Sequence, residues 1–307
     1  MATGRWVGID EAGYGPNLGP LVMTAVVAEG ERPDVWRDLE ATVCRAGGRD
    51  GRLWVDDSKR VYAGGVGLDR LEAATLAMLE AIGVGARSTV CGLLAALGSG
   101  AVDSELDRWA DGVDPPIGGS PAAVPGPLDG APWRIAALRS VVLGPAGFNA
   151  GLTGSKALVH AGAFASLLGP VWEQARDGIP TFIRSDKHGG RHFYADVLVR
   201  ACPGASIAAL VEGPALSHYA LTSPGRRLEV ALEPRADAGD GLVALASMAS
   251  KAVREHWMGV FNAFWARRIP GLRPTAGYPL DAARFRDAIG AEARRLGLDP
   301  EVWWRKK

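Results

Sequence analysis

Two adjacent acids, Asp10 and Glu11, lie between an apolar segment and a glycine-rich turn in the stretch GIDEAGYGPNLGPLV (residues 8–22). Adjacent carboxylates repel each other, and the end of a buried strand is a costly place for charge unless a counter-charge binds there. Neighbouring strand residues point to opposite faces, so both acids reach one site only if the strand twists into its turn, which Gly13 and Gly15 permit. The pair therefore indicates a site for a divalent metal ion.

Two further acids fit this interpretation. Asp186 ends the segment PTFIRSD (residues 180–186), which has the pattern of a strand, and Glu255 lies on a long helical stretch one turn after Lys251. Acids at strand ends, joined by one from a crossing helix, are a common way to hold Mg²⁺. An acid taken singly is more commonly solvated or salt-bridged, so the Asp10–Glu11 pair is the stronger signal.

The elements that must position these acids alternate between strands and helices. Their residue patterns predict strands over 5–10, 21–28, 134–143, 180–186, 206–213 and 226–234, the first two as a hairpin-like pair. They predict helices over 34–46, 68–83, 154–175, 192–201, 242–268 and 281–297. Residues 98–132 are rich in Gly, Pro, Ala and Asp, which is typical of a long surface loop or insertion. We therefore expect an α/β fold, a mixed sheet flanked by helices with a helical C-terminal portion.

The composition of the chain narrows the class of protein. Its 307 residues are 48% hydrophobic, enough for a large core, and 34 Lys and Arg balance 34 Asp and Glu. Zero net charge argues against a strongly basic nucleic-acid coat but leaves room for a local basic groove. Three widely spaced cysteines without a CxxC pair disfavour a disulfide framework or a zinc ribbon. With no signal-peptide or membrane-spanning pattern, we expect a soluble cytoplasmic protein that does not bind membranes.

Four blocks of the sequence resemble one known family. GIDEAGYGPNLGPLV is similar to the first motif of the type 2 ribonucleases H (RNase HII). Three more blocks follow in the family's order and run across most of the chain. DDSKR (56–60) looks like its Asp-Ser-Lys motif, RADAGDGLVALASMASKAVRE (235–255) like its Lys-Ala-Asp segment and following helix, and AGYPLDAARF (276–285) like its Gly-Tyr-Gly-Thr turn.

This resemblance implies a ribonuclease H-like catalytic domain over residues 1–258, with insertions at about 98–132 and about 192–233, and a C-terminal helical extension over 259–307. It implies that two Mg²⁺ or Mn²⁺ ions are held by the catalytic residues Asp10, Glu11, Asp186 and Glu255. Two such ions suit phosphodiester hydrolysis, because they activate water and neutralise charge that develops on the phosphoryl group. Without metal, the grouped carboxylates should raise one another's pKa.

The resemblance and the neighbouring sequence also suggest substrate contacts. They are Gly13, Tyr14, Gly15, Ser58, Lys59, Lys187, His188, Arg191, Lys251 and Tyr278. Tyr14 replaces the arginine of the family's Gly-Arg-Gly turn, which contacts the ribose 2′-OH. Alternatives stay open for several: Tyr278 as a packed tyrosine, Lys59 as a surface lysine, and DKHGGRHFY (186–194) as a solvated basic turn or, less favoured because of its Gly-Gly pair, a zinc site.

We therefore expect a metal-dependent endonuclease that hydrolyses the RNA strand of RNA–DNA hybrids or ribonucleotide-containing DNA by a two-metal mechanism, and acts as a monomer. Two rivals remain. One is a nuclease of the same fold that acts on another nucleic-acid structure, and the other is a non-catalytic nucleic-acid-binding protein. The tail EVWWRKK could grip nucleic acid through aromatic and cationic side chains, although we favour Trp303 and Trp304 as anchors to the core.

Overall fold

The computed structural model describes residues 3–48, 50–63, 66–85, 89–98, 103–117 and 128–306. Its centre is a mixed seven-stranded sheet. In sheet order the strands are β5 (Trp133–Leu143), β2 (Leu21–Gly30), β1 (Gly4–Ala12), β6 (Thr181–Asp186), β9 (Arg226–Glu233), β8 (Ser217–Ser223) and β7 (Ser206–Glu212). β1 pairs antiparallel with β2 and parallel with β6, and β6 pairs parallel with β9. The predicted hairpin-like pair and mixed sheet are confirmed.

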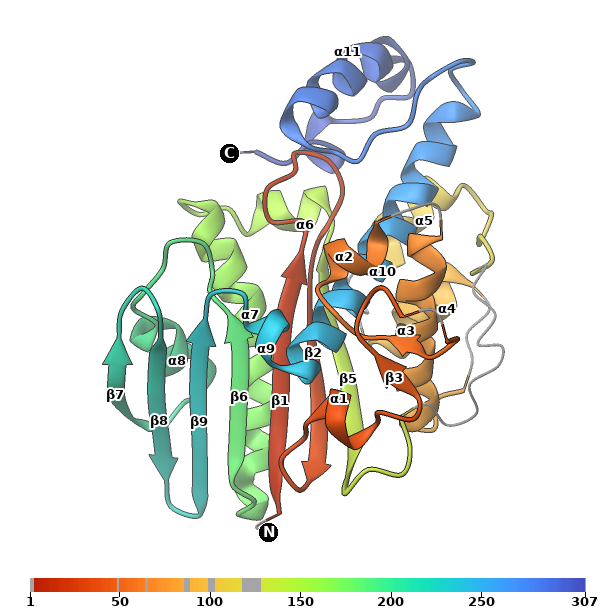
Figure 1. Cartoon of the computed structure of the whole chain (residues 1–307). Helices are drawn as coiled ribbons and strands as arrows, with labels where there is room; N and C mark the ends of the chain where they lie inside the picture. Colours follow the sequence, from red (N-terminus) through yellow and green to blue (C-terminus); the bar gives the residue numbers. More distant parts are fainter. Residues whose placement is uncertain are drawn as a thin grey trace.

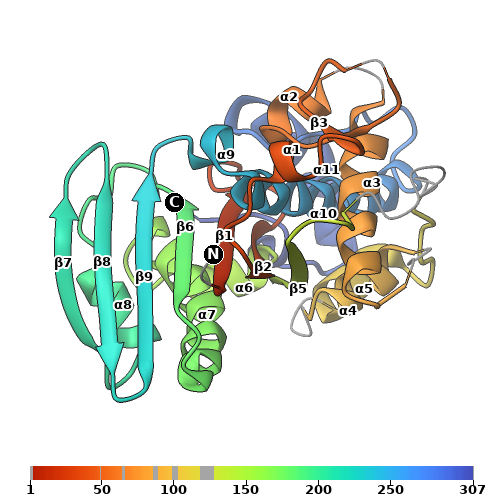
Figure 2. The same cartoon turned by 60° about the horizontal axis from the view of Figure 1, so that its bottom comes forward.

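Helices flank both faces of this sheet (Figures 1 and 2). They are α1 (Val35–Asp38), α2 (Ser58–Tyr62), α3 (Gly67–Ala81), α4 (Val90–Ala96), α5 (Asp103–Ala110), α6 (Pro145–Ala150), α7 (Lys156–Gln174), α8 (Ala195–Ala201), α9 (Ala236–Gly239), α10 (Gly241–Ala266) and α11 (Pro279–Arg295). In Figure 1, α10 crosses in front of β1 and β2, α7 lies behind the sheet, and no described helix lies in front of β8 and β9. No described helix is long and apolar enough to span a bilayer.

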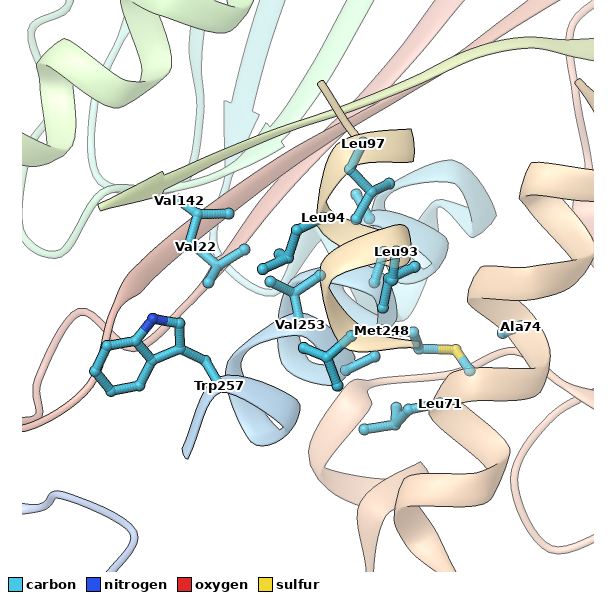
Figure 3. Packing of buried hydrophobic residues seen from close by; sticks show 14 of the residues in the cluster. Val22, Leu71, Ala74, Leu93, Leu94, Leu97, Val142, Met248, Val253 and Trp257 are labelled. Atoms are coloured by element: carbon cyan, nitrogen blue, oxygen red, sulfur yellow. The ribbon is translucent and has the colours of Figure 1, made fainter. Parts of the chain in front are cut away.

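The two faces of the sheet bury two hydrophobic cores. Figure 3 shows the front core, where Val22 of β2 and Val142 of β5 meet Trp257 of α10 and leucines of α4. The rear core packs β1 and β2 against α7, with Ile9 and Phe164 fully buried. β1, which carries Asp10 and Glu11, is therefore held between α10 and α7, which fixes its carboxyl end.

Some sequence expectations need correction. The helix predicted over 34–46 ends at Asp38, and Val43–Cys44 instead forms β3, paired with β4 (Leu53–Trp54). The β8 strand within residues 192–233 was not predicted; with β7 and β9 it extends the sheet. Residues 98–132 include the helix α5, so the predicted loop is not continuous; residues 99–102 and 118–127 lie outside the described part. The division at residue 258 falls inside α10 and stays a prediction.

Candidate metal and nucleic-acid site

Asp10 stands where β1 meets α10. Gly8, one pleat earlier on the same face, approaches α10 so closely that a Cβ there would lie 2.2 Å from the carbonyl carbon of Leu242. The Asp10 side chain is only 7% exposed, and the Ser250 hydroxyl donates to its backbone carbonyl at 3.0 Å. The pKa of Asp10 lies well above its ordinary value because burial and the charge of Glu11 disfavour the anion, against hydrogen bonds from Ser247 and the backbone.

Asp186 reaches the same end of the sheet from β6. Ile9 of β1 lies opposite Ser185 of β6 in the parallel register, so the next residue of each strand is an acid. The amides of Lys187 and Arg235 donate to one Asp186 oxygen at 2.8 and 2.7 Å. Burial nevertheless raises the pKa of Asp186, with a further contribution from Glu11. The structure therefore brings Asp10, Glu11 and Asp186 into mutual electrostatic contact.

Glu11 points to the opposite face, as strand alternation requires. Its carboxylate lies 3.3 Å from Nε2 of His160, a fully buried residue of α7. The His160 ring lies 4.3 Å from that of His188 and edge-on to Tyr14 at 5.0 Å. Neither ring nitrogen of His160 or His188 has a hydrogen-bond partner in the described part of the chain. Two buried imidazoles thus line the rear of the site, and burial lowers the pKa of His188.

A fourth acid that we did not predict, Asp237, joins the group from α9. It is 8% exposed, and its pKa is raised first by burial and then by the charges of Asp57 and Asp186. The sequence did carry a signal for this acid, because Asp237 is the aspartate in the segment that resembles the family's Lys-Ala-Asp. We name Asp10, Glu11, Asp186 and Asp237 the acid cluster.

Glu255 has different surroundings. Its carboxylate accepts hydrogen bonds from the Lys251 ammonium at 2.6 Å and the Tyr62 hydroxyl at 2.9 Å. The Arg254 guanidinium forms an ion pair with it at 3.4 Å. Although burial opposes ionisation, these partners lower the pKa of Glu255 below its ordinary value. Its charge is therefore already compensated by the protein, unlike the charges of the acid cluster.

The acid cluster has the chemistry of a hard-cation site. Within the described ranges none of its four carboxylates forms an ion pair with Lys or Arg, and three have raised pKa values. Carboxylate oxygens without a protein counter-charge are suitable ligands for Mg²⁺ or Mn²⁺. As the described chain stands, no group of three or more His, Cys, Asp and Glu side chains is arranged to hold a metal ion. The types of donor atom in the acid cluster nevertheless fit such an ion.

The predicted substrate contacts divide into two groups. Beside the acid cluster lie the turn residues Gly13, Tyr14 and Gly15, and Lys59, whose charge acts on Asp237. Ser58 is buried and bonded to Ser247 at 3.0 Å. Gly13 must be glycine, since its φ is +88° and a Cβ would lie 2.3 Å from the Pro20 carbonyl oxygen.

The other residues that we predicted to contact substrate are bonded to protein groups or lie farther along the surface. Lys187 is buried, and its ammonium donates to the Gly213 carbonyl and to Ser217. Arg191 pairs with Asp196, and Lys251 with Glu255. Tyr278 is 52% exposed at the start of α11. The Lys187 ammonium is therefore already bonded within the protein, and only the Lys187 amide acts on the acid cluster.

The tail docks onto the turn that follows the acids. Trp303 is buried, which confirms it as an anchor. Arg305 is fully buried; its guanidinium donates to the carbonyls of Gly13 and Tyr14, and its amide donates to Asn17. The tail thus fixes the loop that borders the acid cluster.

Comparisons with known proteins find no matching family model and no matching curated protein. Among solved structures, the ribonuclease H2 from Pyrococcus horikoshii OT3 is 14% identical with a TM-score of 0.47, over 97% of this chain and 92% of that one. RNase HII of Archaeoglobus fulgidus, solved with PCNA, is 14% identical with a TM-score of 0.45, over 99% and 94%. Bst-RNase HIII in complex with Mn²⁺ is 16% identical with a TM-score of 0.46, and the match covers 100% of this chain and 67% of that one.

Proposed function

We propose that this chain is a divergent member of the type 2 ribonuclease H family, a metal-dependent endonuclease that hydrolyses the RNA strand of RNA–DNA hybrids or ribonucleotide-containing DNA. One observation carries the proposal. The acid cluster gathers four carboxylates at the carboxyl ends of β1 and β6 and at α9, with no Lys or Arg ion pair among the described residues. The sequence blocks that resemble the family contribute Asp10, Glu11 and Asp237 to this cluster.

In this proposal the acid cluster holds two Mg²⁺ or Mn²⁺ ions, and Asp237 takes the place that the sequence had suggested for Glu255. The ions, when bound, supply an activated water and charge relief on the phosphoryl oxygens. The protein supplies position: Ser250 and α10 fix the Asp10 backbone, and the amides of Lys187 and Arg235 orient Asp186. Lys59 and the amides of the Gly13–Gly15 turn offer donors to substrate phosphates.

The test is cleavage of labelled duplexes in Mg²⁺ or Mn²⁺ by wild type and Asp10→Asn. The panel contains an RNA–DNA hybrid, DNA with one ribonucleotide, plain DNA and plain RNA. We expect cuts at ribonucleotides that need metal and are lost in Asp10→Asn. If wild type binds Mn²⁺ but leaves both ribonucleotide-containing duplexes intact, the ribonuclease proposal is wrong.

A nuclease of the same fold with another nucleic-acid substrate is the second candidate. It is favoured by Tyr14, whose ring packs edge-on against His160 where the family presents an arginine to the 2′-OH. The 2′-OH is the group that distinguishes RNA from DNA. Cleavage of plain or branched DNA, with no preference for ribonucleotides, would support this candidate.

A further inference from the structure

A cavity of about 320 Å³ opens on the front face of the sheet, and no residue of the acid cluster lines it. Its walls come from β1, β6, β8 and β9, from residues 32–33, and from the start of α10. In Figure 1 no described helix lies in front of β8 and β9, the strands on one side of this cavity. A volume of this size matches a small-molecule site, and none of the steps proposed above uses it.

The floor of the cavity is aromatic. Trp6 and Phe182 stack with their ring centroids 4.5 Å apart and their planes 16° apart. The Arg32 guanidinium lies 6.0 Å from the centre of the Trp6 ring. The two rings cover each other's inner faces, so a planar heterocycle can stack on the outer face of the pair, as flat aromatic surfaces allow.

The rim of the cavity carries one donor between two acceptors. The Arg184 guanidinium lies 4.0 Å from the Glu233 carboxylate and 3.9 Å from that of Asp240. Both distances are too long for hydrogen bonds, so Arg184, Glu233 and Oδ2 of Asp240 can each bond to a ligand. Oδ1 of Asp240 already caps α10, where it accepts from the amides of Leu242 and Val243 at 2.9 and 3.2 Å. Glu229 also lines the cavity but is less available to a ligand, because His218 and Arg227 already contact its two oxygens at 3.3 and 2.9 Å.

We propose that this cavity binds a nucleobase with an exocyclic amino group, namely guanine, cytosine or adenine. The base stacks on the Trp6–Phe182 floor, its amino group donates to Glu233 or Asp240, and a ring nitrogen or carbonyl accepts from Arg184. Arginine to guanine and carboxylate to cytosine are established base contacts. Uracil and thymine have no amino group, so only their single ring N–H can donate to a carboxylate, and they cannot make the amino contact described here.

The base has two possible sources, a free nucleotide or an unpaired residue of a bound strand. The cavity lies on the same face as Asp10 and Asp186, because Trp6 and Arg184 precede them by even numbers of residues. Arg184 is two residues before Asp186, roughly 7 Å along the strand, and Glu233 lies opposite Asp186. A strand cut at the acid cluster could thus place an unpaired base here. Only this second source rests on the proposed function.

The first experiment titrates GMP, CMP, AMP and UMP into the metal-free protein by calorimetry. We expect at least one amino-bearing nucleotide to bind about tenfold more tightly than UMP. Arg184→Met and Glu233→Gln should each remove most of that preference. Arg200→Met and Glu173→Gln are matched controls outside the cavity and should retain it. Absence of saturable binding, or equal affinities for all four nucleotides, would overturn the proposal, as would loss of the preference in the controls.

A second arm separates the two sources. Asp10→Asn leaves the cavity intact, so binding of blunt duplexes and duplexes with unpaired ends is compared in this variant. Tighter binding of the unpaired ends, reversed by the preferred nucleotide and by Arg184→Met, supports the strand as the source. Nucleotide binding without any such advantage supports the free nucleotide. Because neither arm depends on cleavage, an inactive wild type would count against the nuclease and not against the cavity.

Discussion

Asp10 and Glu11 are joined by one peptide bond, yet they face different layers of the molecule. Asp10 points toward α10 on the front, while Glu11 points toward His160 of α7 on the rear. The two carboxylates therefore approach the end of β1 from both sides of the sheet. Substitutions in α10 should for this reason act mainly on Asp10, and substitutions in α7 mainly on Glu11.

The first prediction concerns Asp10 in the absence of metal. Its folded pKa lies above the unfolded value, so its contribution to stability is fully present at acid pH and is lost as the pH rises through the folded pKa. Asp10→Asn removes a buried charge, and the metal-free variant should melt at a higher temperature than wild type at neutral pH. The gap should close as the pH falls below the unfolded pKa.

Thermal unfolding in EDTA from acid to neutral pH measures this effect. Glu31→Gln, which follows β2 at the far end from the acid cluster, is the control for the loss of one carboxylate. Added Mn²⁺ should stabilise wild type more than Asp10→Asn, because binding to the native state adds to stability. A metal-free Asp10→Asn protein that melts below wild type at neutral pH would contradict the prediction.

A second prediction compares Asp237 with Glu255. If the proposed function holds, Asp237→Asn should lower the cleavage rate by about a hundredfold or more, because Asp237 is a metal ligand in that proposal, and should weaken Mn²⁺ binding in calorimetry. Glu255→Gln should leave Mn²⁺ affinity within a few-fold, since this carboxylate is already paired with Lys251. The reverse pattern would restore Glu255 as the fourth ligand.

At the residue scale, the sequence supplies the acids at strand ends but not the choice between Asp237 and Glu255. Asp10, Glu11 and Asp186 follow apolar strands, which is a local signal. Whether a helical acid meets them depends on its partners across the fold. Lys251, one turn before Glu255, was visible in the sequence, but Tyr62 comes from a separate helix nearly two hundred positions earlier.

At the scale of elements, the contact between β1 and α10 decides where the site lies. We predict that Gly8→Ala destabilises the protein by about 3 kcal/mol, because its Cβ would overlap the backbone of Leu242 and Val243. Denaturant unfolding measures the change. Gly162→Ala is the matched control, since no atom lies within 4 Å of its added Cβ on α7. It should stabilise by about 0.5–1 kcal/mol. Equal effects at both positions would disprove the close approach.

The long helices can be predicted from the local pattern of apolar residues, whereas the short helices and strands cannot. α7, α10 and α11 match the periodic stretches, because an apolar stripe over many turns has one stable partner surface. The segment 34–46 has helical spacing too, but Val43–Cys44 pairs with Leu53–Trp54 in the folded chain. β8 escaped prediction because SHYALTS mixes polar and apolar residues, and its strand conformation depends on pairing with β9.

At the scale of the whole molecule, the tail is part of the site. Arg305→Met removes two hydrogen bonds that hold Gly13 and Tyr14, and we expect a loss of about 2–3 kcal/mol of stability. Limited proteolysis should show faster cleavage near residues 13–17. Lys306→Met is the control, because that side chain is 53% exposed and bonded only to Glu301 among its described ion pairs. Unchanged proteolysis in Arg305→Met would show that the loop is rigid by itself.

The pairing of β1 with β6 also constrains the order of folding. Residues 5–9 meet residues 181–185, and Asp237 lies farther still along the chain. Contacts between such distant segments form late, because loop closure must precede them. The β1–β2 hairpin can form early, but it carries only Asp10 and Glu11. A folding intermediate that contains this hairpin alone would lack half of the acid cluster. The metal binding and nucleic-acid cleavage that we propose should therefore arise only in the last steps toward the native sheet.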